Sequence, residues 1–219
     1  SNNINDLQPA TQMIWKDFAN KYGSLGKTYG YQFRYVKESN PIRSKNMKSS
    51  NTHTKYEYQE IDPFDMRDSV CLENKIIDQV KKLEYDIKNN PMSRRLMVNL
   101  WNVGQLDDMS LPPCAFNSQF LLRPLNINER YDLYYKQSND ENLELNHEFY
   151  DNAEIPKYEI SCILTQRSGD LLLGVPFNIA SYSLLLILLA KTHNLTVGNL
   201  HHNIGDCHIY KNHLFAVDE

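Results

Sequence analysis

The stretch Gln166–Ser181 constrains the fold of this chain more than any other. It places a cation, a hydroxyl and a carboxylate within four residues, as Arg167, Ser168 and Asp170. An apolar run and a Gly/Pro turn follow, and then Asn178, a residue type that can cap the start of a helix. The pattern therefore predicts a site at the junction of a strand, a turn and a helix.

The remaining local patterns alternate between helical and extended spacing. Apolar residues at helical intervals predict helices at 7–22, 71–88 and 179–192. Alternating apolar and polar residues predict strands at 31–36, 96–100, 116–122, 158–165 and 200–204. This mixture indicates an α/β (α+β) protein, and no internal repeat is visible.

The length and composition suit one domain with a sizeable core. The chain has 219 residues, 41% of them hydrophobic, so we predict a single domain over 1–219. Two segments lose the apolar pattern: 37–65 is rich in Ser, Asn, Lys and Thr, and 123–157 is rich in Asn, Asp and Glu. We expect both to be surface insertions in the domain.

Charge and hydropathy exclude several classes of protein. A net charge of −4 and a pI near 6.0 give no general reason to bind nucleic acid. The apolar run at 183–190 is too short to cross a bilayer and predicts a buried helix, and the polar first residues carry no secretory signal. We therefore expect a cytoplasmic protein with no membrane partner.

The cysteines and histidines do not have the spacing of a metal site. Four cysteines lie far apart without a C-x-x-C pair, which argues against a zinc knuckle and a disulfide scaffold. The histidines near the end of the chain lack tightly spaced carboxylate or thiol neighbours. We expect no bound metal and reduced cysteines.

Five motifs in a fixed order carry a family resemblance: Asn90–Arg95, Trp101–Leu106, Leu111–Cys114, Gln166–Ser181 and Gly205–His213. Together they closely resemble the folate-dependent thymidylate synthases, whose superfamily includes dCMP hydroxymethylases. The string R-S-x-D-x-x-x-G-x-P-F-N-I-A-S-Y is specific on its own. The resemblance implies a mixed β-sheet packed against helices, and a homodimer.

The resemblance also implies a reaction, the reductive methylation of dUMP to dTMP with 5,10-methylenetetrahydrofolate as co-substrate. A thiolate that adds to C6 of the uracil ring turns C5 into a nucleophile able to attack the methylene group of the reduced folate. Cys114 matches the thiol. An ordinary thiol needs nearby positive charge to ionise at neutral pH, and Arg167 matches an arginine beside both the thiol and the nucleotide phosphate.

Further residue roles follow from the same motifs. The catalytic matches are Cys114, Arg167, Tyr29 and Asp170. The substrate-binding matches are Arg94 and Arg95, which the family donates across the dimer interface, with Arg167, Ser168, Gln166, Asn178, His208 and Tyr210. Asn178 matches an amide that favours uracil over cytosine. The folate-side matches are Asp170, Gly174, Phe177, Trp15 and Leu111.

Departures from the family pattern leave two alternatives open. Ala115 stands where the family usually has His, and Gly169 where it often has Cys. The chain starts after the family's catalytic glutamate and arginine loop, and stops before its closing C-terminal segment. A pyrimidine nucleotide hydroxymethylase, in which water quenches the exocyclic methylene, is one alternative. A non-catalytic or incomplete homologue is the other.

Overall fold

A computed structural model describes residues 3, 8, 15–22, 24–42, 54–57, 71–141 and 146–217 of the chain. The chain divides into two compact units. The first unit comprises Ser1–Lys82 and Gly104–Leu111, and the second comprises Leu83–Val103 and Pro112–Glu219. The boundary between the units falls within α3 (Gln79–Asn89).

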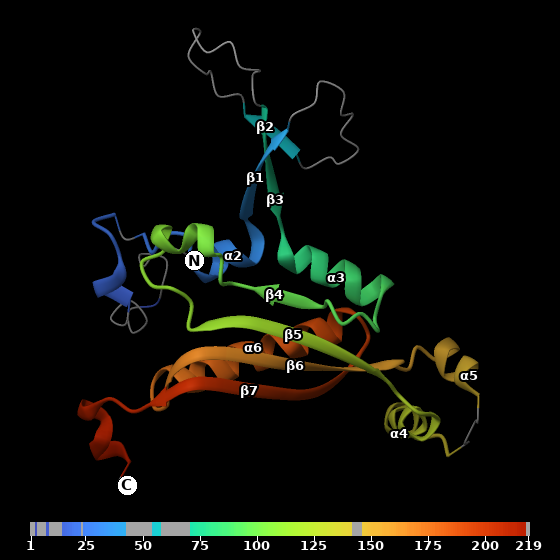
Figure 1. Ribbon diagram of the computed structural model, residues 1–219. Helices are drawn as coiled ribbons and strands as arrows, with labels where there is room; N and C mark the ends of the chain where they lie inside the picture. The colour runs from blue at the N-terminus through green and yellow to red at the C-terminus, as the bar shows by residue number, and fades with distance from the viewer. Residues whose placement is uncertain are drawn as a thin grey trace. The chain divides into compact units, whose positions relative to one another are not determined.

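The second unit is built on a four-stranded sheet with the order β4-β5-β6-β7 (Figure 1). The strands are β4 (Met97–Asn99), β5 (Ala115–Pro124), β6 (Tyr158–Asp170) and β7 (Thr196–His208). The β4/β5 and β5/β6 pairs are antiparallel, whereas β6 and β7 are parallel, so the sheet is mixed. Parallel neighbours need a long crossover, and the helix α6 (Gly174–Thr192) supplies it.

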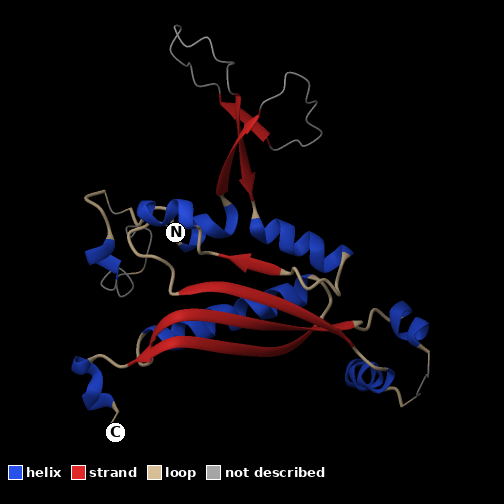
Figure 2. Cartoon of the chain, in the orientation of Figure 1, coloured by secondary structure: helices blue, strands red, loops and turns tan. Residues whose placement is uncertain are grey.

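Helix α6 lies along one face of this sheet, against β6 and β7 (Figure 2). The β6 residues that face it are buried and alternate with half-buried ones, as Ile160, Cys162 and Leu164 show. On the helix, Leu186 and Leu189 are 2% and 4% exposed. These apolar side chains form the core beneath the site.

The prediction that the apolar run of α6 is buried is correct for one side of the helix only. Leu184 and Leu188 are 56% and 53% exposed, because the sheet covers only the opposite side. By length and composition α6 is also apolar enough to cross a membrane, a test that core helices of soluble proteins pass as well. Here α6 packs against β6 and β7.

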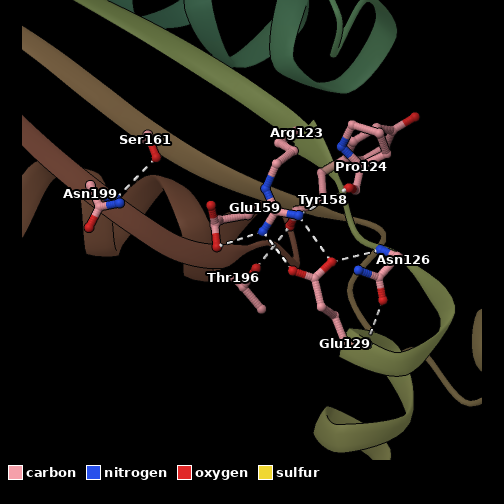
Figure 3. A network of polar contacts seen from close by, with 9 residues as sticks. All are labelled: Arg123, Pro124, Asn126, Glu129, Tyr158, Glu159, Ser161, Thr196 and Asn199. Carbon is pink, nitrogen blue, oxygen red and sulfur yellow. Dashed lines mark hydrogen bonds and ion pairs between the residues drawn. The ribbon is translucent and has the colours of Figure 1, made fainter.

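The segment between β5 and β6, predicted as an insertion at 123–157, contains two helices. They are α4 (Ile127–Ser138) and α5 (His147–Asn152). Asn126 caps α4. Its side-chain oxygen accepts from the backbone N–H of Glu129, and the Glu129 carboxylate accepts from the backbone N–H of Asn126. Arg123 holds the base of the segment through ion pairs with Glu129 and Glu159 at 2.9 and 3.1 Å (Figure 3).

The first unit contains a three-stranded antiparallel sheet of order β1-β3-β2. Its strands are β1 (Val36–Ile42), β2 (Thr54–Glu57) and β3 (Cys71–Ile77), and its helical elements are η2 (Lys16–Phe18), α2 (Tyr29–Arg34) and most of η3 (Val103–Asp108). Buried Gln32 joins α2 to η3 by donating to Gln105 at 2.8 Å. The short helix η4 (Lys211–Ala216) follows β7 in the second unit.

The predicted strands of the second unit are confirmed as β4, β5, β6 and β7. Two predictions in the first unit are wrong: residues 31–34, where the strand at 31–36 was expected to begin, belong to the helix α2, and 71–77 form a strand where the helix at 71–88 was expected to begin. Residues 7 and 9–14 of the helix predicted at 7–22 lie outside the described residues; in the rest, the short helix η2 covers Lys16–Phe18, and 19–22 are not helical. Much of the insertion predicted at 37–65 also lies outside the described residues.

Candidate active site

The sulfur of Cys114 lies beside the guanidinium group of Arg167, with Nη2 and Sγ 3.9 Å apart. The backbone brings them together, because Cys114 immediately precedes β5 and the Arg167 amide donates to the Cys114 carbonyl at 2.8 Å. A guanidinium group stays charged at any physiological pH. Nucleophilic cysteines typically lie beside such positive groups, because the thiolate is the reactive form of the side chain.

Three contacts hold the Arg167 side chain in this position. Its Nε donates to the Pro113 carbonyl and its Nη2 to the Pro112 carbonyl, both at 3.0 Å. The centre of its guanidinium lies 5.8 Å from the Trp101 ring, in cation–π range. Prolines at 112 and 113 cannot donate from their nitrogens, but their carbonyls remain acceptors. The turn before the cysteine therefore orients the cation beside it.

The carboxyl ends of β6 and β7 form the second part of the site. Their parallel register pairs Ser168 with Asp206 and Asp170 with His208. Such strand ends, where the chain leaves the sheet, commonly hold ligands. The His208 Nδ1 atom lies 3.3 Å from the Asp206 carboxylate. The ring of Tyr210 meets that of His208 edge-on, with centroids 5.1 Å apart.

Asn178 faces the same strands from α6. Gln166, 2% exposed on β6, donates from its Nε2 to the Asn178 Oδ1 at 3.1 Å. The prediction that Asn178 caps the helix is wrong, because α6 begins at Gly174 and its N-cap position is Leu173, which makes no side-chain cap bond. Asn178 is instead bonded to the sheet.

The predicted folate-side residues divide between the two units. Gly174 opens α6, and Phe177 in its first turn is 63% exposed. The Asp170 carboxylate accepts from the Leu172 amide at 3.3 Å in the turn between β6 and α6. Trp15, Tyr29 and Leu111 belong to the first unit, so their place in the site stays a prediction.

Arg94 and Arg95 lie in the turn between α3 and β4, and both are exposed. Within the part of the chain that the structure describes, neither guanidinium group makes a hydrogen bond or an ion pair. The turn itself is ordered by hydrogen bonds to its backbone, since the Arg95 amide donates to Ser93 Oγ at 3.1 Å and Gln119 donates to the Arg94 carbonyl at 3.2 Å. Their predicted role in a second subunit stays a prediction.

Comparison with known proteins shows the family of this chain. A thymidylate synthase family model matches residues 1–219. A thymidylate synthase of Vesicomyosocius okutanii is 34% identical over 99% of this chain and 57% of its own length, and one of Coxiella burnetii is 35% identical over 96% and 55%. This chain belongs to the thymidylate synthase family.

The fold agrees with that membership. Thermostable thymidylate synthase A from Bacillus subtilis aligns with a TM-score of 0.61 at 26% identity, covering 100% of this chain and 55% of that one. The predicted thymidylate synthase fold, a mixed sheet packed against helices, is therefore confirmed. The chain spans little more than half the length of the thymidylate synthases that it matches.

Sequence reasoning missed two residues that lie beside the candidate site residues. Trp101 lies inside a matched motif, but nothing in the sequence indicates that the centre of its ring lies 5.8 Å from the Arg167 guanidinium carbon. His202 lies 2.9 Å from Gln166, and only the alternation along β7 hinted that it points toward the core. Among the described residues, no group of three or more His, Cys, Asp or Glu is arranged to hold a metal ion.

The environments of the thiols predict selective alkylation. Burial raises the pKa of Cys162 to about 12, so this thiol stays protonated and unreactive in neutral or mildly basic solution. We expect iodoacetamide at about pH 8 to modify exposed Cys207 and half-buried Cys114 well before Cys162. Peptide mass mapping over time checks the order. Equal rates for Cys162 and Cys207 in the folded protein would contradict it, and equal rates in concentrated guanidinium are the control.

Proposed function

We propose that this protein is a thymidylate synthase, which converts dUMP and 5,10-methylenetetrahydrofolate to dTMP and dihydrofolate. The observation that carries the proposal is the contact between Cys114 and Arg167, at 3.9 Å, in a chain of this family. A thiol beside a fixed cation at the edge of a sheet suits a nucleophile, whereas a structural thiol such as Cys162 is buried away from charge.

The chemistry needs a reversible covalent bond between enzyme and pyrimidine. The Cys114 thiolate adds to C6 of the uracil ring, and the electron pair moves to C5, which then bonds to the methylene carbon of the folate. Loss of the C5 proton and cleavage of the bond to the folate nitrogen leave an exocyclic methylene. Hydride transfer from the tetrahydropterin to that methylene, with departure of the thiolate, gives dTMP and dihydrofolate.

The proposed nucleotide site uses the carboxyl ends of β6 and β7. Arg167 and Ser168 would bind the phosphate, since a guanidinium fork and a hydroxyl both donate to phosphate oxygens. His208 and Tyr210, whose rings are in contact, would bind the ribose hydroxyl. Asn178 would bind the pyrimidine edge, with Gln166 as its support. Asp170, Gly174 and Phe177 would line the folate side of the same site.

We propose that the protein acts as a cytoplasmic homodimer, as the family forms dimers. The exposed guanidinium groups of Arg94 and Arg95 suit a phosphate in a second copy of the chain. Sedimentation velocity of the intact protein would give the mass of a dimer. A variant with Ala at both positions would then bind dUMP more weakly without dissociating, if these groups act on the phosphate.

The decisive experiment is mass spectrometry of the nucleotide after incubation of the intact protein with dUMP and 5,10-methylenetetrahydrofolate. The appearance of dTMP supports the proposal. A product heavier by the elements of formaldehyde, 5-hydroxymethyl-dUMP, would identify a hydroxymethylase instead. Unchanged dUMP together with no dUMP binding would overturn both enzyme assignments.

A further inference from the structure

His202 is part of a chain of three polar side chains that ends at Asn178. It lies on β7, opposite Leu164 of β6 in the parallel register, and its Nε2 is 2.9 Å from the Gln166 Oε1. Burial lowers the pKa of His202, so the imidazole is neutral at physiological pH. Because a carboxamide oxygen only accepts, the proton of the neutral ring must be on Nε2, and His202 donates.

The orientation of the Gln166 amide is fixed by the backbone. Its Nε2 lies 2.8 Å from the Ser168 carbonyl oxygen, which can only accept, so this atom must be the amide nitrogen. The second hydrogen of Nε2 goes to the Asn178 Oδ1 at 3.1 Å. Both N–H groups of the Gln166 amide therefore have acceptors, the Ser168 carbonyl and the Asn178 Oδ1, and the Oε1 atom faces His202.

The close packing around Gln166 leaves its side chain few other orientations. The residue is 2% exposed, so water does not replace a lost partner easily. A Cβ atom on Gly169 would lie 3.3 Å from the Gln166 Nε2 and 2.9 Å from a Val175 methyl carbon. Gln166 is enclosed by strand and helix, and its rotamer depends on the bonds at both ends of its amide.

The fixed Gln166 amide in turn sets the orientation of the Asn178 amide. Because its Oδ1 accepts from Gln166, its amide nitrogen is held on the other side of the group. Uracil presents an acceptor at O4 next to a donor at N3, whereas cytosine presents a donor next to an acceptor. An Asn fixed in one orientation can match only one of these edges, and a rotated amide would match the other.

We propose that His202 is a positioning residue that sets the preference for uracil over cytosine, because its hydrogen bond to Gln166 keeps the Asn178 amide in one orientation. The inference rests on the proposed function, since it assumes that Asn178 meets the pyrimidine. Without the imidazole donor, the buried Gln166 Oε1 loses its partner. The Gln166 amide then turns to recover one and releases the Asn178 Oδ1.

Two substitutions distinguish the effect of the His202 hydrogen bond from the effect of the volume that its side chain fills. His202→Phe keeps a ring but removes the donor, whereas His202→Gln keeps an amide nitrogen close to the place of Nε2. The measurement is the dissociation constant of dUMP and of dCMP by calorimetry on the intact protein. We expect His202→Phe to lower the preference for dUMP by roughly fivefold, the size of one neutral hydrogen bond, and His202→Gln to restore most of it.

The other results decide against the inference. If His202→Phe leaves the ratio of the dCMP and dUMP dissociation constants at its wild-type value, even while both nucleotides bind more weakly, His202 has no part in selectivity. Should the Phe variant not fold, nitrogen NMR of the wild-type imidazole tests the same bond: a proton on Nε2 supports it, and a proton on Nδ1 alone overturns it. A wild-type protein that binds neither nucleotide overturns the proposed function, and the tautomer still reports on the Gln166 bond.

Discussion

A Cys114→Ala variant of the intact protein is expected to form dTMP at least roughly 10⁴-fold more slowly than the wild type. The loss is large because the covalent adduct cannot form without the sulfur, and no other nucleophile is held beside the Arg167 guanidinium in the described part of the site. Nucleotide binding should change little, since the phosphate, ribose and pyrimidine contacts come from other residues. Mass spectrometry of the nucleotide product and dUMP calorimetry measure the two effects separately.

The matched control is Cys207→Ala. Cys207 is an exposed thiol on β7 whose backbone pairs with Gly169, and it has no role in the proposed reaction. This variant should keep the wild-type rate within about twofold, as is usual for a surface substitution. A Cys114→Ala protein that still makes dTMP at a comparable rate would exclude Cys114 as the nucleophile. Loss of dUMP binding in the same variant would point to a structural role instead.

The strands around the site could be predicted because their side chains repeat with period two. In β6, Ile160, Cys162 and Leu164 face the core and alternate with half-buried residues, so local sequence is enough to define the strand and its inner face. The family resemblance carried by the motifs implied that Cys114 and Arg167 lie side by side. The hydrogen bonds that make them meet, through the Pro112 and Pro113 carbonyls, depend on backbone geometry that no local pattern encodes.

The first unit shows why local periodicity fails elsewhere. Tyr31, Phe33 and Tyr35 alternate as in a strand, yet 29–34 is a helix whose buried residue is the polar Gln32. Its side chain donates to the Lys27 carbonyl at 3.0 Å and to Gln105 at 2.8 Å. The contact with Gln105 joins residues far apart in the sequence, so no local pattern predicts it. The two contacts together outweigh the propensity of the aromatic residues for extended structure.

Two other errors have the same origin. The strand at 71–77 is defined by its pairing with β1, in which Ile77 lies opposite Val36, and such long-range pairing is absent from the spacing of Ile76 and Ile77. The start of α6 was placed too late because Asn178 suits a cap. Pro176 is tolerated within the first helical turn, and the Asn178 side chain is engaged by Gln166, so the helix begins earlier, at Gly174.

The second large effect is expected from the segment between β5 and β6. Arg130 on α4 is 2% exposed, and its Nη2 donates to the Asp151 carboxylate at 2.7 Å and to the Ile155 carbonyl at 2.9 Å. Its Nη1 donates to the His147 carbonyl at 3.1 Å. One side chain therefore joins α4 to α5 and to the chain that enters β6.

An Arg130→Ala variant should lose about 3 kcal/mol of stability, because a buried carbonyl and a partly buried carboxylate lose their donor. For a chain of this size that corresponds to a fall in Tm of roughly 6–12 °C. Thermal unfolding followed by circular dichroism measures it. The matched control is Arg123→Ala, which breaks two ion pairs to carboxylates where Arg130→Ala breaks one, but at an exposed position where solvent screens them. Its effect should be much smaller.

Acidification should reduce the difference between wild type and Arg130→Ala. The Lys157 ammonium, together with Arg130, holds the pKa of Asp151 below its usual range. A carboxyl whose pKa is lower in the folded state stabilises the fold above its unfolded pKa of about 3.9, and this contribution is lost as the pH falls through the folded value.

Equal Tm shifts for the Arg130 and Arg123 variants at neutral pH would show that burial does not make the Arg130 contacts stronger, and that α4 and α5 are held by their apolar contacts instead.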